Sequence, residues 1–382
     1  MGLVERLDAA IARFDRGPEY WQAASGEMTA SVREASTAAP AVRETLTAAL
    51  AARFDHEHPV LGAHLALLAG ALVETGIRLG SVPSALLAPL ERALVAAQRF
   101  VELANEHAGD GDGDPKRGLF VGDKYLSEAS LAALSSRDVE AVRAFESLQT
   151  WYRPAVALWT RDRATLPRAQ AEPTLRAAVE ALAKLSQGAF WLATLLDVCI
   201  EVPFLVLIPE LQEAWELIVD GCVDNEQLLT LLSEALCPSL RRLGVAAPAP
   251  AAVLAIARGD GPQQAQSHYS AAFQIYAWQA IDRDSGWPVN GRFVWHSPGG
   301  RGDSWLPGDF RPSRVVPLEG KRVVVLVKSS MTRVISAARL FESLPASIAN
   351  VRQLSASEAK RWTDIVAPNF FVRGREIPKP RY

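Results

Sequence analysis

The sequence predicts a multidomain protein that is mainly helical and ends in a smaller α+β domain. Apolar residues recur at steps of three and four through the first two thirds of the 382-residue chain, and strand-like runs replace that pattern after residue 263. Two stretches rich in Gly, Pro and Ala interrupt the chain. Its length accommodates two or three domains at about 100–200 residues each.

Two stretches with low propensity for helix and strand set the predicted boundaries. Residues 109–118, GDGDGDPKRG, are expected to form an acidic Gly-rich linker, since they offer nothing apolar to bury. Residues 244–262 concentrate Ala, Pro and Gly, and are expected to form a second linker. The predicted modules are therefore helical over 1–108, helical over 119–243 and α+β over 263–382.

Helical periodicity defines the first two modules. In 1–108, Gly80 and Pro83 mark a stop and a restart between two helices. In 119–243, Asp224 and Gln227 resemble a capping box. Residues with helical spacing are Leu61, Leu65, Leu68 and Leu72, then Leu90, Leu94 and Phe100, then Val139, Val142, Phe145 and Leu148, and finally Leu175, Val179, Leu182 and Leu185.

The third module changes to strand-like patterns. Residues 321–329, KRVVVLVKS, carry a continuous apolar core that is typical of a strand buried on both faces. A capping box at Ser355 and Glu358 predicts a helix after it. The other expected elements are a hairpin of 273–281 with 291–297, a helix over 331–343 and a final strand over 369–377.

Composition excludes several classes of protein. With 49% hydrophobic and 22% charged residues the chain resembles a globular protein, which argues against wholesale disorder. Three Cys exclude a disulfide scaffold. The N-terminus lacks the apolar centre of a secretory signal. The apolar window 189–208 contains Asp197, Glu201 and Pro203, so we expect two buried elements there, no membrane association and a cytoplasmic location.

Charge is unevenly distributed along the sequence. Residues 263–382 hold 17 Lys plus Arg and 9 Asp plus Glu, a net of +8, whereas residues 1–262 hold 23 and 34, a net of −11. The two parts attract each other, or the basic face is simply solvated, or that face binds nucleic acid or an acidic protein. Its residues would be Arg311, Arg314, Lys321, Arg322, Lys328 and Arg333, joined by Arg373 and Arg375, with Trp287, Trp295 and Trp305 for base stacking.

No motif predicts a metal or cofactor site. His56, His58 and His64 are only weak metal candidates, because a zinc site needs three or four converging ligands and His58 precedes Pro59 in a loop that enters a helix. Asp282 and Asp284 suit a β-turn as well as a metal-binding pair. The glycine-rich stretch 297–304 is not followed by the helix that a phosphate site requires. We therefore predict no cofactor.

The sequence favours a non-enzymatic scaffold or adaptor of a bacterial multi-protein assembly. Large helical surfaces, opposed charges and the lack of catalytic signatures motivate this hypothesis. One alternative is a nucleic-acid-binding protein that uses the basic C-terminal domain. A second alternative is an enzyme with an unrecognised site in a cleft between the last two modules.

Overall fold

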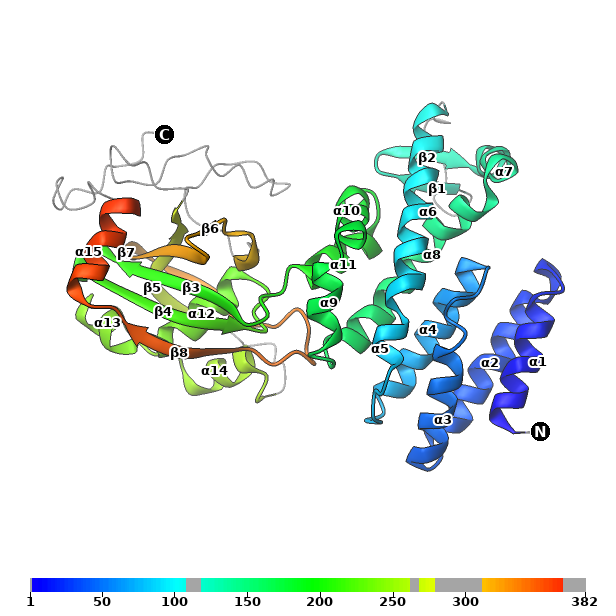
Figure 1. The fold of residues 1–382 in the computed structure, drawn as a ribbon, viewed down its shortest axis with the longest axis horizontal. Helices are drawn as coiled ribbons and strands as arrows, with labels where there is room; N and C mark the ends of the chain where they lie inside the picture. Colours follow the sequence, from blue (N-terminus) through cyan, green and yellow to red (C-terminus); the bar gives the residue numbers. More distant parts are fainter. Residues whose placement is uncertain (1, 108–117, 262–267, 279–310, 367–382) are drawn as a thin grey trace. The chain divides into compact units, whose positions relative to one another are not determined.

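The computed structural model describes residues 2–107, 118–261, 268–278 and 311–366, and the side chains of 330 and 331 are outside this description. The chain forms two compact units, Met1–Leu196 (unit 1) and Asp197–Tyr382 (unit 2). In the described residues, no helix is both long and apolar enough to cross a membrane. The prediction of a helical N-terminal part and an α+β C-terminal part is confirmed (Figure 1).

Unit 1 is built almost entirely of helices. The longest, α8 at its centre, packs against α4, α6 and α11 and buries residues around much of its circumference. The Trp159 indole N–H of α8 donates to the Pro83 carbonyl oxygen at 3.0 Å. The elements are α1 Leu3–Phe14, α2 Trp21–Ser36, α3 Pro40–Ala51, α4 Pro59–Val73, α5 Val82–Ala85, α6 Leu87–Glu106, β1 Gly118–Val121, β2 Lys124–Ser127, α7 Glu128–Arg137, α8 Val139–Trp159, α9 Thr165–Ala171, α10 Pro173–Leu182 and α11 Gln187–Leu196.

The helical periodicity read from the sequence matches the buried faces of this unit. The four leucines at 61, 65, 68 and 72 lie on α4 and are buried, as are the apolar positions 90, 94 and 100 of α6. Two positions are exceptions: Val139 begins α8 and is exposed, and Leu185 lies beyond the end of α10 at Leu182 and is only partly buried. The predicted linker 109–118 lies outside the described residues except for Gly118, which begins the β1–β2 hairpin.

Unit 2 is a mixed sheet with helices on both faces. The strand order is β5-β7-β3-β4-β8, with β6 also paired to β7, and all pairs are antiparallel except β3 with β7. The elements are β3 Val202–Ile208, β4 Glu213–Asp220, α12 Asn225–Ala235, α13 Cys237–Arg242, α14 Ala251–Arg258, β5 His268–Ala277, β6 Pro317–Leu318, β7 Lys321–Ser336, β8 Ser347–Gln353 and α15 Ala356–Val366.

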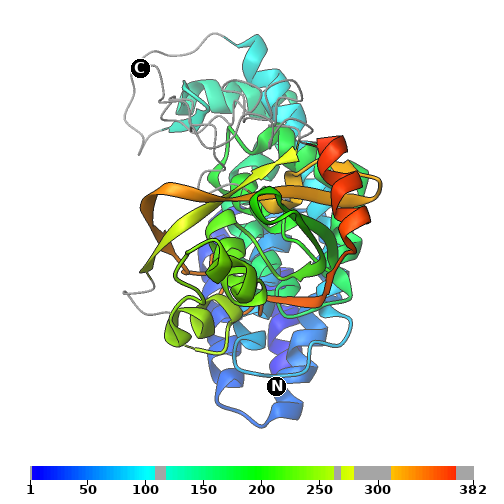
Figure 2. The same cartoon turned by 90° about the vertical axis from the view of Figure 1, so that its left-hand side faces the viewer.

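Each face of this sheet has its own apolar core. Helices α12 to α14 bury one face, where Phe204 and Phe273 are fully enclosed. Helix α15 packs on the opposite face through Trp362, against Leu205 and Val323 among others (Figure 2, α15 in red). The alternate residues of β3 and β7 therefore point into two different cores, which explains their continuous apolar sequence.

In unit 2, the helix-capping residues predicted from the sequence lie at the ends of helices. The Asp224 carboxylate accepts the Gln227 N–H at 2.8 Å, and the Gln227 side-chain oxygen accepts the Val223 N–H at 3.0 Å. Helix α12 ends before Pro238, and Gly244 follows α13 at φ +71°. At α15, the Ser355 hydroxyl accepts the Glu358 N–H and the Glu358 carboxylate accepts the Ser355 N–H, which confirms the second capping box.

Several predicted elements differ from the structure. The helix expected over 331–343 is wrong, because β7 continues to Ser336 through pairing with β5 from Ala271 back to His268. Strand β5 pairs with β7 on one side, whereas its expected hairpin partner 291–297 and the expected strand 369–377 lie outside the described residues. Tertiary pairing overrides the helical propensity of this short stretch.

The compact units do not coincide with the predicted modules. Strands β3 and β4 lie within 119–243, where only helices were expected. Helix α14 lies within 244–262, the expected linker, and buries Val253 and Leu254 in the core. Because β3 pairs with β7, residues on both sides of 244–262 belong to one sheet, and the division falls between Leu196 and Asp197.

Candidate functional site

The charge asymmetry of the sequence disappears when it is counted over the compact units. Residues 1–196 hold 20 Lys plus Arg and 24 Asp plus Glu, a net of −4, and residues 197–382 hold 20 and 19, a net of +1. The acids of 197–262 therefore balance the basic residues that follow them. Within unit 2, carboxylates that precede residue 262 form ion pairs with cations that follow it.

Arg311 and Arg314 converge on a single buried carboxylate. Asp197 is only 3% exposed, and its Oδ2 accepts from Arg311 Nη1 at 2.6 Å and from Arg314 Nε at 2.7 Å. Asp197 precedes β3, whereas Arg311 comes directly before the 3₁₀ turn Pro312–Arg314 and Arg314 is the last residue of that turn, which precedes β6. These two candidate residues thus connect segments more than a hundred residues apart in sequence.

Lys321 belongs to a second network, which attaches α15 to the sheet. Its ammonium pairs with Glu216 of β4 and lies 5.6 Å from the centre of the Trp362 ring. Arg352 of β8 also pairs with Glu216, at 2.5 Å, and these hydrogen bonds hold the pKa of Glu216 below its usual value. Arg361 lies 5.1 Å from the same ring, so cations of α15 and β7 both contact Trp362.

The other predicted cations do not complete a common site. The Arg322 guanidinium donates to the Val315 carbonyl oxygen at 2.5 Å, and Arg333 pairs with Ala271 in the β5–β7 ladder. Lys328 has an exposed side chain. The structure therefore brings Arg311 and Arg314 together and places Lys321 on a different carboxylate. The remaining predicted residues, Trp287, Trp295, Trp305, Arg373 and Arg375, lie outside the described residues.

One buried carboxylate was not predicted from the sequence. Glu213, at the start of β4, accepts hydrogen bonds from the Ser239 hydroxyl at 2.7 Å and the Trp215 indole at 3.3 Å, and pairs with Arg242. Burial raises the pKa of Glu213, but the hydrogen bonds together lower it by a larger amount, so the pKa of Glu213 lies below its usual value. A lowered pKa suits a carboxylate that joins β4 to α13, and does not suit a general base working near neutral pH.

The three histidines considered as metal ligands do not form a metal-binding group, although the His56 Nδ1 accepts the His58 N–H at 3.0 Å. His56 Nε2 lies 3.2 Å from the Asp15 carboxylate, whereas the His58 ring packs against Phe14 and Trp21. His64 lies further along α4. Within the described part of the chain, no group of three or more His, Cys, Asp or Glu could hold a metal ion.

The cysteines differ in exposure, which predicts a labelling pattern. Cys199 and Cys222 are fully buried, and burial raises the pKa of Cys199 to about 12 and that of Cys222 well above its usual value. Cys237 is only partly buried. We expect one thiol per chain to react with an aromatic disulfide reagent in the native protein at pH 8, and three in urea. Two or more thiols reacting rapidly before unfolding would contradict this.

Comparisons with known proteins identify no relative. No protein-family model, no curated protein and no solved structure matches this chain.

Proposed function

We propose that the protein is a scaffold or adaptor whose helical unit 1 contacts a protein partner. The observation that carries this proposal is the construction of unit 1 from packed helix pairs, α1 with α2, α3 with α4, and α10 with α11, of which the last two pack against α6 and α8. Helical arrays of this kind offer extended ridges and grooves for protein binding. Unit 2 supports this proposal indirectly. Three of its predicted binding residues, Arg311, Arg314 and Lys321, already pair with Asp197 or Glu216 and are therefore less available to a partner.

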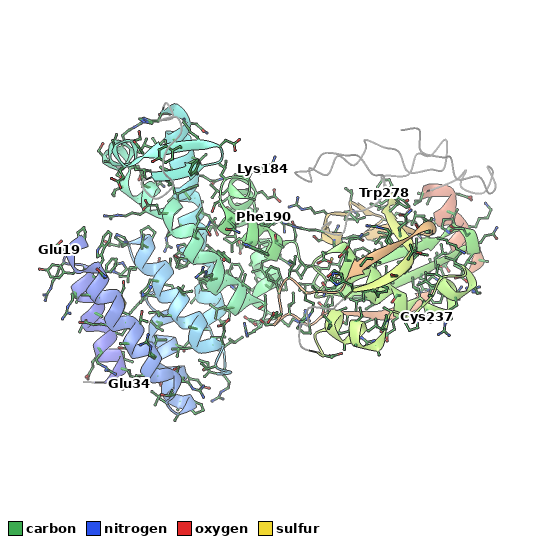
Figure 3. All side chains as sticks on the ribbon, turned by 180° about the vertical axis from the view of Figure 1, so that it is seen from behind. Glu19, Glu34, Lys184, Phe190, Cys237 and Trp278 are labelled. Atoms are coloured by element: carbon green, nitrogen blue, oxygen red, sulfur yellow. The ribbon has the colours of Figure 1, made fainter. Side chains whose placement is uncertain are left out.

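Unit 1 also exposes large apolar side chains that could contact a partner. Phe190 on α11, labelled in Figure 3, is 46% exposed, and Phe120 of β1 is exposed to a similar extent. Aromatic residues are enriched at binding hot spots. Both side chains are more than 40% exposed, so they are suitable reporter positions. The exposed large apolar residues of unit 1 are Tyr20, Val42, Phe120, Val139 and Phe190.

Site-specific crosslinking tests the proposal in the native host. A photoreactive phenylalanine analogue at Phe190 or Phe120 of the full chain is expected to yield a discrete protein adduct, and Phe190→Ser should reduce recovery of that partner several-fold. Analogues at Val334 and Val351, which are exposed positions of unit 2, are the matched controls. Adducts only from the unit 2 positions, or from none, would contradict a role for unit 1 in binding.

The first alternative is nucleic-acid binding through the basic segment 263–382. This alternative predicts tight binding of DNA or RNA, whereas the scaffold proposal predicts only weak binding. Because unit 2 has a net charge of only +1, we expect any binding of labelled DNA or RNA to be no tighter than the ~10⁻⁴–10⁻⁶ M of non-specific association. Titrations at 50 and 200 mM salt measure this. Tight binding that weakens by orders of magnitude between the two salt concentrations would favour the nucleic-acid alternative instead.

The enzymatic alternative has less support from the arrangement of unit 2. This alternative requires a catalytic site in a cleft between the predicted modules 119–243 and 263–382. Residues of both segments instead share one apolar core, in which Phe204 and Leu232 pack together with Phe273 and Leu326. In the described residues, the boundary of these two predicted modules is therefore filled with apolar side chains, and we do not favour a catalytic site there.

A further inference from the structure

An aromatic cluster joins four helices of unit 1. The rings of Phe14, at the end of α1, and Trp21, at the start of α2, stack with centroids 5.1 Å apart. The His58 ring, at the N-cap of α4, packs edge-on against both rings, 4.7 Å from that of Trp21. The Arg143 guanidinium of α8 lies 5.3 Å from the Trp21 ring. Through this cluster, the α1–α2 pair contacts α4 and α8.

Two histidines of α4 are enclosed at this contact without full hydrogen bonding. Neither ring nitrogen of His58 has a partner among the described residues, although both atoms are buried, and Nε2 of His64 is in the same situation. His64 faces the Ser25 carbonyl of α2. Helices α1 and α2 otherwise pack mainly on each other, and reach the rest of the unit through α3 and α4. The α2–α4 interface therefore holds two neutral imidazoles.

We propose that the α2–α4 interface is an acid-labile joint, at which protonation of His58 and His64 releases the α1–α2 pair from the rest of unit 1. A proton on either buried ring nitrogen of His58 would create a charge with no hydrogen-bond acceptor, and His64 has only the Ser25 carbonyl nearby to offset the cost of burying a charge. The N-terminus of α4 and the Arg143 guanidinium both repel an imidazolium at position 58. The joint is thus stable only while both rings are neutral.

The neighbouring charges set the direction of the effect. Burial first, then Arg143 and His56, lower the pKa of His58 from 6.5 to about 4, and Asp15 opposes this only partly. Burial also lowers the pKa of His64. At His58, the released state binds a proton near pH 6.5 and the closed state only near pH 4, so release becomes more favourable as the pH falls through this window. The Asp8–Arg53 ion pair, at 2.5 Å, is a further link from α1 to the segment before α4.

Hydrogen exchange of the full chain measures the release. Between pH 7 and pH 5, after correction for intrinsic exchange rates, His58 alone is expected to raise the opening of α1–α2 about twentyfold relative to α6 and α8. The double variant His58→Phe/His64→Gln, which keeps an aromatic ring at position 58 and a donor at position 64, should lose this response. His268→Gln, at an exposed histidine of unit 2, should keep it.

A second variant, which places a permanent positive charge at position 58, keeps the proposal testable if the double variant does not fold. His58→Lys should open α1–α2 already at pH 7, while α6 and α8 stay protected. The proposal is overturned if exchange in wild type rises equally across unit 1, if α1–α2 does not respond to pH, or if the double variant responds like wild type.

Discussion

Gly221→Ala should destabilise unit 2 by about 3–5 kcal/mol, as the sum of backbone strain and overpacking. Gly221 follows β4 at φ +66°, and a Cβ there would lie 1.9 Å from the Pro345 carbonyl oxygen. The Gly221 N–H donates to the Cys199 carbonyl at 2.7 Å, and the Cys199 N–H donates to Cys222 at 2.8 Å. This is a G1 bulge, in which the first residue needs the left-handed conformation.

Gly320→Ala is the matched control for this prediction. Gly320 lies in the turn before β7 at φ +77°, and an added Cβ would meet nothing within 4 Å. This control therefore carries the conformational cost alone, about 1–2 kcal/mol. Urea unfolding of the full chain, with the unit 2 transition identified by hydrogen exchange in β3 and β4, measures both variants. Equal destabilisation by the two substitutions would show that the approach of Pro345 contributes nothing.

Helix faces were predictable from the sequence because one side of each helix is buried. The leucines of α4 and the apolar positions of α6 recur with the period of a helix, so burial leaves a visible pattern. The sequence signals for the ends of helices were also predictable, because they depend on residues close together in the sequence. Asp224 with Gln227, and Ser355 with Glu358, make their hydrogen bonds within four residues, so no long-range contact needs to be known.

The architecture of unit 2 was not predictable, because it depends on pairing between distant strands. Strand β3 is apolar along its length, and a short run of this kind cannot be distinguished by periodicity from a buried helix. Its parallel partner β7 is more than a hundred residues away. The assignment of 244–262 as a linker then separated two halves of one sheet and produced a charge asymmetry that no compact unit has.

The candidate site was misleading for the same reason. Arg311, Arg314 and Lys321 are grouped in sequence, but their partners Asp197 and Glu216 come from before residue 262. The one local signal was Asp197 itself, an acid inside an apolar window. Such an acid indicates a paired charge, and the sequence does not reveal with which cation it pairs.

Asp197→Asn should destabilise unit 2 by about 3–5 kcal/mol, the usual cost of removing one member of a buried ion pair. The amide retains the shape of the carboxylate, but it leaves Arg311, which is 14% exposed, and Arg314 facing a neutral group. Urea unfolding, again with the unit 2 transition identified by hydrogen exchange, gives the change in the free energy of unfolding. A loss below 1 kcal/mol would contradict a role for this carboxylate in holding β3 and the 3₁₀ turn together.

Two further variants separate charge pairing from general damage at this position. Glu319→Gln removes a carboxylate from the exposed pair with Arg361, so it should cost far less stability than Asp197→Asn. Combining Asp197→Leu with Arg311→Met and Arg314→Met removes all three charges, and should recover most of the stability, since apolar replacement of a buried ion cluster is often neutral. If the triple variant is as unstable as Asp197→Asn, the loss comes from packing around residue 197 and the unpaired arginines are not its cause.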